Sequence, residues 1–213
     1  MKYEEVVKRN PNKKIHSVAS QAFNDYGTVY EYNVEEVINY ALENVEVPKS
    51  GDFYQATHDG LESIPVVQTI SKDLFGGLSV QAGACVGHNK ALTGFEYHQG
   101  SEVIIAVTDC VIILGKRQDM QGYDYQGEKA ELFFVEKGQV VELYGTTLHY
   151  TPCKVEDYFM TIVLLLKGTN VEFDQPKGIC TKRNKYLIVH PSQTEKVEAG
   201  TYPGLLGDMI RIN

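Results

Sequence analysis

The second half of the chain alternates apolar and polar residues, a pattern typical of strands with one buried face. Short segments of this kind follow one another from residue 78, and Gly, Asp or Asn stands at most of the joins between them. We expect strands at residues 78–86, 92–98, 103–108, 110–116, 131–135, 139–144, 148–152, 160–167 and 185–191. Because no helical pattern separates the first eight, they should pair antiparallel in an all-β jelly roll or closed barrel, which removes exposed sheet edges.

The first 73 residues follow a mixed pattern. Residues 33–42 place their apolar side chains on one helical face, with Asn33 positioned to cap the helix. Residues 4–9 predict one or two helical turns, and residues 27–32 predict a strand. This part holds too little apolar material for a core of its own. We therefore expect residues 1–73 to form a mixed α+β elaboration that packs on a barrel domain of residues 74–213, which includes a C-terminal extension.

Composition and charge indicate an ordinary globular protein. The 213 residues are 43% hydrophobic and 23% charged, and 20 basic against 28 acidic residues give a net charge of −8. Since no Lys/Arg cluster is dense enough to follow a phosphate backbone, we expect no nucleic-acid partner. The longest apolar runs are far shorter than the roughly 20 residues that span a bilayer, so we expect no membrane partner.

The cysteines and the N-terminus bear on the cellular compartment. No signal peptide is visible at the start of the chain. The four cysteines are widely spaced and include no CxxC pair, which is typical of reduced thiols. We therefore expect a cytoplasmic protein.

The expected strand at residues 92–98 carries two side chains suited to metal binding. Glu96 and His98 share one face of this strand, and Phe95 and Tyr97 share the other. Glu102 has the same parity as His98, but on a straight strand it would lie about 13 Å beyond it. The intervening Gln-Gly-Ser sequence favours a turn, because Gly tolerates positive φ and Ser can bond neighbouring backbone. Such a turn would bring Glu102 back beside His98.

A fourth ligand is expected from residues 136–150. This stretch predicts a strand, a Gly turn, a second strand, a second Gly turn and then His149 among apolar and aromatic residues. Two carboxylates and two imidazoles suit a divalent ion that accepts mixed oxygen and nitrogen ligands, such as Mn, Fe, Ni or Zn. We therefore predict a metal site made of Glu96, His98, Glu102 and His149.

These two motifs resemble those of the cupin superfamily, in which a His-rich strand pair ends in Glu and a Pro/Gly turn precedes a lone His. The matching residues are Glu96, His98, Glu102 and Gly115 in the first motif, and Lys137, Gly138 and His149 in the second. Two positions depart from the usual pattern, because Glu96 stands where cupins usually carry a first His and Lys137 stands where they often carry a Pro. The resemblance covers about residues 75–170 and implies a double-stranded β-helix, the cupin jelly-roll barrel.

Plainer interpretations exist for the same residues. Glu102 could pair with a nearby Lys or Arg, His98 could be a hydrogen-bonded core histidine, and the whole set could be a buried polar network. Glu96 is harder to dismiss, because an unpaired carboxylate in an apolar strand costs several kcal/mol. His88, ten residues before His98, could replace Glu96 as a ligand, line the substrate pocket, or be an exposed loop residue.

The predicted set of carboxylate and imidazole ligands is also similar to that of cupin-type sugar isomerases, which use His, Glu and His ligands in the same order. This resemblance implies an enzyme that isomerises or epimerises a sugar or sugar derivative, with the ion holding a carbonyl and its neighbouring hydroxyl. Those enzymes tend to carry a Lys between the first-motif ligands, and this chain has none. We therefore assign proton transfer to Lys167 or His88, with Glu96 as a further candidate.

Two other functions fit the same motifs. An iron- or nickel-dependent oxygenase would use open coordination positions for dioxygen, and a non-catalytic cupin would bind a sugar without turnover. In each case the expected partner is a small molecule, most simply a carbohydrate. Cupins commonly associate through sheet edges, so the resemblance also implies a homodimer.

Overall fold

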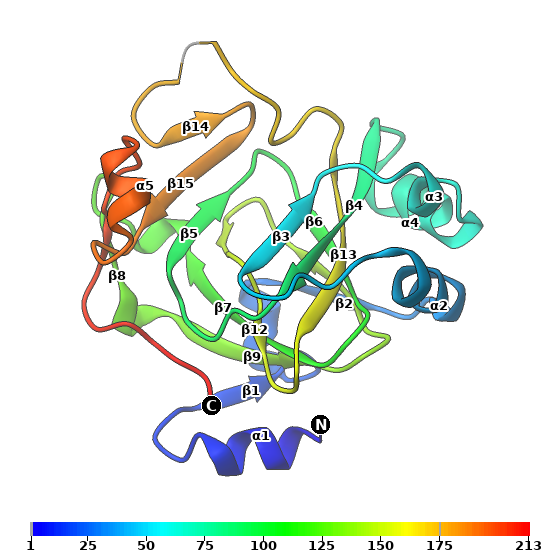
Figure 1. Ribbon diagram of the computed structural model, residues 1–213, viewed down its shortest axis with the longest axis horizontal. Coiled ribbons are helices and arrows are strands. Elements are labelled where there is room, and N and C mark those ends of the chain that lie inside the picture. Colours follow the sequence, from blue (N-terminus) through cyan, green and yellow to red (C-terminus); the bar gives the residue numbers. More distant parts are fainter. Residues whose placement is uncertain (1, 175) are drawn as a thin grey trace.

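The computed structural model describes residues 2–174 and 176–213, and its centre is a pair of large β-sheets (Figure 1). One has six strands in the order β2 (Gly27–Tyr30), β10 (Val140–Leu143), β6 (Glu102–Ala106), β13 (Phe159–Leu166), β4 (Val80–Gly87) and β3 (Asp52–Gln55). The other has the order β1 (Ile15–Ser17), β9 (Glu131–Val135), β7 (Cys110–Lys116) and β11 (Thr147–Leu148), and β12 (Cys153–Lys154) also pairs with β7. This arrangement is the jelly-roll form of the predicted all-β fold.

Alternate residues of the central strands explain why both faces of the large sheets are buried. In β6, Ile104 and Ala106 pack in a core that the two sheets share, while Val103 and Ile105 pack on the opposite side with apolar residues of the helices. In β7, Ile112 belongs to the shared core, and the residues on either side of it belong to a third cluster on the far face. Such strands read as nearly continuous apolar runs because each face meets a different core.

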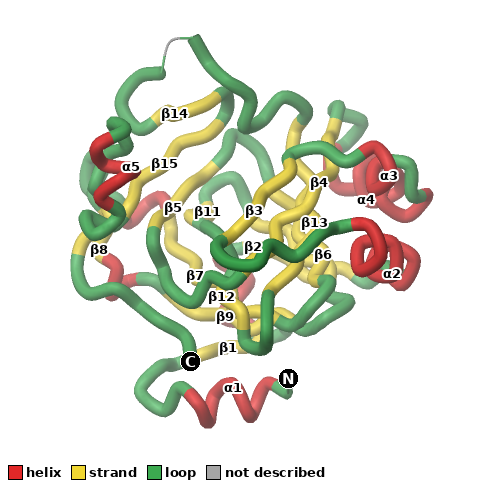
Figure 2. Tube along the Cα trace, viewed as in Figure 1, coloured by secondary structure: helices red, strands yellow, loops and turns green. Residues whose placement is uncertain are grey.

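Helices cover the outer face of the six-stranded sheet. They are α2 (Glu35–Asn44), α3 (Asp59–Glu62) and α4 (Pro65–Phe75), and Figure 2 shows them together at one side of the molecule. The remaining helical segments are α1 (Tyr3–Arg9), η1 (Gln21–Asp25), η2 (Arg117–Asp119), η3 (Gly127–Lys129) and α5 (Thr194–Glu198). Apolar residues of α2 and α4, such as Val37 and Ile70, share one cluster with the sheet.

Two smaller sheets complete the fold. The C-terminal strands β14 (Cys180–Lys182) and β15 (Lys185–Val189) continue onto β5 (Gly94–Tyr97) in a three-stranded sheet, and β16 (Leu205–Leu206) pairs with β8 (Tyr125–Gln126). In the three-stranded sheet Leu187 lies opposite Glu96 and Tyr186 opposite Tyr97. The C-terminal extension therefore lies beside β5, the strand that carries Glu96, in the same sheet.

Most predicted elements are present, and the differences have local causes. The expected strand at residues 148–152 is shortened to β11, because Pro152 has no N–H for a ladder and the chain bends before β12. Helix α4 was not predicted, although it begins with a Pro at its first turn and ends at Gly76, whose φ of 58° is left-handed. Strand β3 was not predicted either, because as an exposed edge strand it has no alternation of buried and exposed positions.

The expected boundary between residues 73 and 74 falls inside α4, and it stays a prediction. Among residues 2–174 and 176–213, the structure contains no helix with both the length and the apolar character needed to cross a bilayer.

Candidate metal centre

Backbone pairing places Glu96 and His149 side by side. The two residues exchange both of their backbone hydrogen bonds, with the Glu96 nitrogen 2.7 Å from the His149 oxygen and the His149 nitrogen 2.9 Å from the Glu96 oxygen. Directly opposed residues of an antiparallel pair point to the same face. His98, two residues beyond Glu96, shares that face, and Phe95 and Tyr97 pack in a cluster on the other side, as predicted.

A tight turn then returns the chain to the same point. Gly100 has a φ of 111°, a backbone conformation that L-residues with side chains rarely adopt, so the Gly is required here. The turn leads into β6 with Glu102 as its first residue. One carboxylate oxygen of Glu102 lies 3.6 Å from His98 Nε2 and 3.3 Å from His149 Nε2. The predicted convergence of Glu102 on the two histidines is therefore what the structure has.

Both imidazoles are oriented by backbone carbonyls. Nδ1 of His98 lies 2.7 Å from the Asn184 oxygen, and Nδ1 of His149 lies 3.0 Å from the Thr147 oxygen. A carbonyl accepts only from an N–H, so Nδ1 carries the proton of the neutral ring, and Nε2, which faces the carboxylates, is the atom free to bind a metal. Both Nε2 atoms are buried, and among the described residues neither has a hydrogen bond of ordinary geometry.

These distances suit a shared ion. Two ligands that each bind one ion at about 2.1 Å lie about 3.0–3.4 Å apart in tetrahedral or octahedral geometry. The Nε2 atom of His98 is 3.9 Å from Glu96 Oε1, and ligand atoms of Glu96, His98 and His149 all lie within 4.8 Å of one another. The two rings, with centroids 5.3 Å apart, turn inward. The cluster thus fits a divalent metal ion that takes nitrogen and oxygen ligands.

The charges of the cluster are strongly coupled. Burial opposes ionisation of Glu102, but the neighbouring His149 and His98 outweigh it and hold the pKa of this carboxyl well below its usual range. Burial also opposes ionisation of Glu96, but Lys185, His98 and His149 together lower its pKa. For His149 burial favours the neutral ring, yet the Glu102 carboxylate raises its pKa to about 9. Without an ion, a proton on His149 takes the place of the metal charge.

Lys185 is the residue that sequence reasoning missed. It begins β15, two residues before the partner of Glu96, and therefore lies on the ligand face. Its ammonium group forms an ion pair with Glu96 Oε2, and both side chains are largely buried. The sequence predicted a strand at 185–191 that contains Lys185. It did not predict that this strand pairs with β5, because nothing in the local sequence identifies a partner strand.

The structure does not bring the two proposed catalytic residues to this site. Lys167 follows the last residue of β13 and its side chain is exposed to solvent. His88 follows β4, and its ring nitrogens lie 3.0 Å and 2.8 Å from the backbone oxygens of Asp157 and Pro48. These contacts tie neighbouring loops together, and neither His88 nor Lys167 is among the described residues that line the cavity.

A cavity of about 600 Å³ opens above the cluster. Glu96, Glu102 and His149 line it, and so do Lys185 and Lys196. Lys196 Nζ donates a hydrogen bond of 2.6 Å to the Tyr150 hydroxyl. Burial and the charge of Lys185 both lower the pKa of Lys196. A volume of this size accommodates a small metabolite.

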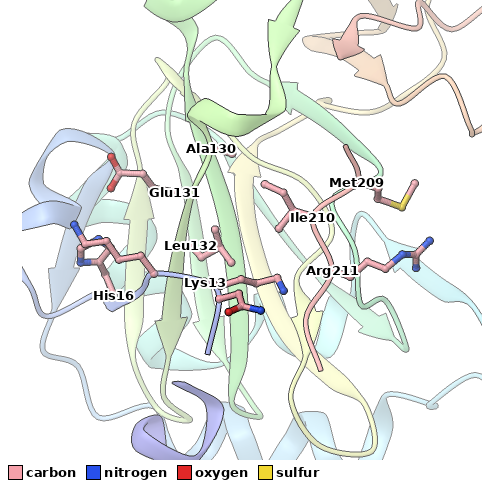
Figure 3. A pocket seen from close by; sticks show the side chains of 10 residues that line it. Lys13, His16, Ala130, Glu131, Leu132, Met209, Ile210 and Arg211 are labelled. Carbon is pink, nitrogen blue, oxygen red and sulfur yellow. The ribbon is translucent and has the colours of Figure 1, made fainter. Parts of the chain in front are cut away.

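A second depression, of about 520 Å³, lies elsewhere, between β9, the segment before β1 and the C-terminal tail (Figure 3). Lys13, His16 and Arg211 surround it together with Glu131. Among the described residues, the group of possible metal ligands is Glu96, His98 and His149. None of these three residues lines the second depression.

Several solved structures resemble the chain over part of its length. A mutant of the oxalate decarboxylase from Bacillus subtilis shares 10% identity, with a TM-score of 0.33, and the match covers 59% of this chain and 28% of that one. A cupin-like protein from Thermotoga maritima shares 15% identity over 57% of this chain and 78% of that one, with a TM-score of 0.33. A structure of DMSP lyases shares 16% identity over 45% of this chain and 44% of that one, with a TM-score of 0.31. The chain spans 28% of the length of the oxalate decarboxylase that it matches.

The cupin resemblance inferred from the two motifs is confirmed, since the strands that carry them form a jelly roll and Glu96, His98 and His149 meet within it. No curated protein sequence matches the chain. A family model described as "Domain of unknown function (DUF4867)" matches residues 15–210, nearly the whole chain. The chain therefore belongs to the DUF4867 family.

Proposed function

We propose that this protein is a metal-dependent enzyme that isomerises or epimerises a small polar substrate, a sugar or sugar derivative. The observation that carries the proposal is the pair of buried Nε2 atoms, on His98 and His149, that face two carboxylates at the base of a cavity. Histidines held through Nδ1 by carbonyls and pointing Nε2 at carboxylates are arranged as metal ligands are.

Glu96, His98, Glu102 and His149 would hold the ion. When bound, a divalent ion would polarise a carbonyl and its neighbouring hydroxyl, which lowers the cost of removing the proton from the carbon that bears the hydroxyl. The side chains that line the cavity would fix the position of the substrate above the cluster and limit the access of water.

A proton must also be taken from a substrate carbon and then returned. Lys167 and His88 were expected to do this, but they lie outside the cavity, so the role passes to groups that line it. Because Glu96 is one of the ligands, Lys185 is the best-placed lining residue: it contacts Glu96, its neutral amine can accept a proton, and its ammonium form can return one. In an isomerisation, Lys185 would hold the proton that leaves the hydroxyl-bearing carbon and return it to the former carbonyl carbon, while the hydroxyl proton passes to the former carbonyl oxygen. In an epimerisation, the proton returns to the carbon it left, on the opposite face.

The first experiment is elemental analysis of protein purified without added ions. We expect close to one divalent ion per chain in the wild type and in His16→Gln, whose histidine lies in the other depression, and little in His98→Gln. Equal metal content in all three proteins would contradict the assignment of the ligands.

The second experiment measures turnover. The metal-loaded protein is incubated with aldoses, ketoses and their acid and phosphate derivatives, and products are separated by chromatography. We expect interconversion of one aldose–ketose or epimer pair, and its loss in Lys185→Met. Dioxygen consumption would point to an oxygenase instead, and tight binding without product would point to a non-catalytic sugar-binding cupin.

We further propose that the protein works in the cytoplasm as a homodimer. The cysteines of the described residues are all free thiols, which suits a reducing compartment. Strand β3 ends the six-stranded sheet and carries exposed side chains, so a second copy has an edge on which to pack. Sedimentation or light scattering would test the assembly, and a mass of one chain would refute it.

A further inference from the structure

We propose that the substrate is anionic, with a carboxylate or phosphate group that lies against Lys196, Tyr150 and Lys185 while the rest of the molecule reaches the metal cluster. This inference rests on the proposed function and specifies its substrate class. It starts from three hydrogen-bond donors that line the cavity, two of which, Lys196 and Tyr150, are in direct contact.

The donors of these three residues outnumber their acceptors. Lys196 Nζ uses one of its three hydrogens on the Tyr150 hydroxyl oxygen, at 2.6 Å. The Tyr150 hydroxyl oxygen therefore already accepts one hydrogen bond, and the hydroxyl hydrogen remains available to a ligand. Among the described residues no acceptor for that hydrogen is found. A ligand that brings several oxygen acceptors would satisfy both groups at once.

The charges change when the ion binds. In the metal-free cluster, Lys185 is balanced by Glu96. A divalent ion held by Glu96 and Glu102 uses the charge of both carboxylates, and Lys185 and Lys196 then face the cavity with less compensation. Asp52 also lines the cavity and keeps its negative charge, but its side chain is exposed to solvent, and one of its oxygens accepts the backbone N–H groups of His88 and Asn89, each at 2.9 Å.

Glu195 is the other acidic residue of the lining, but it is exposed to solvent on the short helix that carries Lys196. With the ion bound, the inner part of the cavity thus presents two ammonium groups, those of Lys185 and Lys196, in a chain whose net charge is −8. Ammonium groups in a partly enclosed cavity attract and retain anions.

The test compares matched ligands by calorimetry on manganese-loaded protein. The probes are D-glucose, D-glucuronate and D-glucose 6-phosphate, which differ at one carbon, and the proteins are the wild type, Lys196→Met, Tyr150→Phe and Lys129→Met. Lys129 is an exposed lysine of η3 outside the cavity, so its variant matches the charge change. Metal content is measured on every sample.

We expect at least one anionic probe to bind wild type at least tenfold more tightly than glucose. Lys196→Met should weaken that binding about tenfold, which corresponds to about 1.4 kcal/mol, and Tyr150→Phe should weaken it less. Binding of the neutral sugar, the metal content and the Lys129→Met protein should not change. The better of the two anions identifies a carboxylate or a phosphate.

Equal affinity for charged and neutral probes, an unchanged Lys196→Met protein, or no binding of either anion at millimolar concentration would overturn the inference while the metal site stands. Failure of the wild type to retain manganese would instead overturn the proposed function. The metal measurement therefore separates the two failures.

Discussion

The raised pKa of His149 makes the stability of the metal-free protein depend on pH in a specific direction. The Glu102 carboxylate outweighs the effect of burial and raises the pKa of His149 to about 9 in the folded protein, from 6.5 in an unfolded chain. A group with a higher folded pKa binds its proton more tightly when folded. Its contribution to stability is therefore complete below pH 6.5 and is lost as the pH rises through 9.

The size of the effect follows from the same two values. Each pKa difference of one corresponds to about 1.36 kcal/mol, so a folded pKa of about 9 against 6.5 contributes about 3 kcal/mol at low pH. Most of this should disappear between pH 6.5 and pH 9. A divalent ion needs the neutral imidazole, so ion binding replaces the proton and the stabilisation by metal should grow over the same range.

Urea unfolding of chelator-treated protein at pH 6.5, 7.5, 8.5 and 9 measures the first effect. The His149→Gln variant, also metal-free, is the control, because it retains all other titrating groups. We expect the unfolding free energy of the wild type to fall by about 2–3 kcal/mol more than that of the variant. If the two proteins change in parallel with pH, the coupling between His149 and Glu102 is not what the geometry indicates.

Three further predictions concern the metal and the core. Adding a chelator at pH 8 should lower the melting temperature of the wild type but not of Glu102→Gln. An ion present at 100 times its Kd stabilises the folded state by about 2.7 kcal/mol, and the chelator removes this stabilisation. Equal shifts of the two proteins in a thermal scan would count against Glu102 as a ligand. Replacing Phe133, which is buried against Phe23 and Tyr26, with Ala should cost about 3–5 kcal/mol in urea unfolding, and a loss below 1 kcal/mol would show that the shared core can collapse around the gap. Gly27→Ala should destabilise the protein or prevent folding, since its Cβ would overlap the backbone oxygen of Glu142 on the neighbouring strand; a stability equal to wild type by circular dichroism would show that β2 can shift.

The sequence was sufficient for features that depend on neighbouring residues. Alternation of side chains predicted most of the strands, because one pleated strand presents alternate residues to different layers. The same alternation placed Glu96 and His98 on one face, and the Gly at position 100 explained how Glu102 could return to them. The pattern of strands and Gly turns before His149, together with the resemblance to the second cupin motif, also singled out this residue.

Only the tertiary structure decided which distant residues join this cluster. Lys185 meets Glu96 because β15 pairs with β5, and Lys196 lines the cavity because α5 follows that strand; a residue's own neighbours contain no record of such pairings. For the same reason the sequence could not place Lys167 and His88, which do not line the cavity: each stands just past the end of a strand, Lys167 exposed to solvent and His88 in contact with loop carbonyls. Local sequence determines which face a side chain takes, whereas strand pairing and packing decide what that face meets.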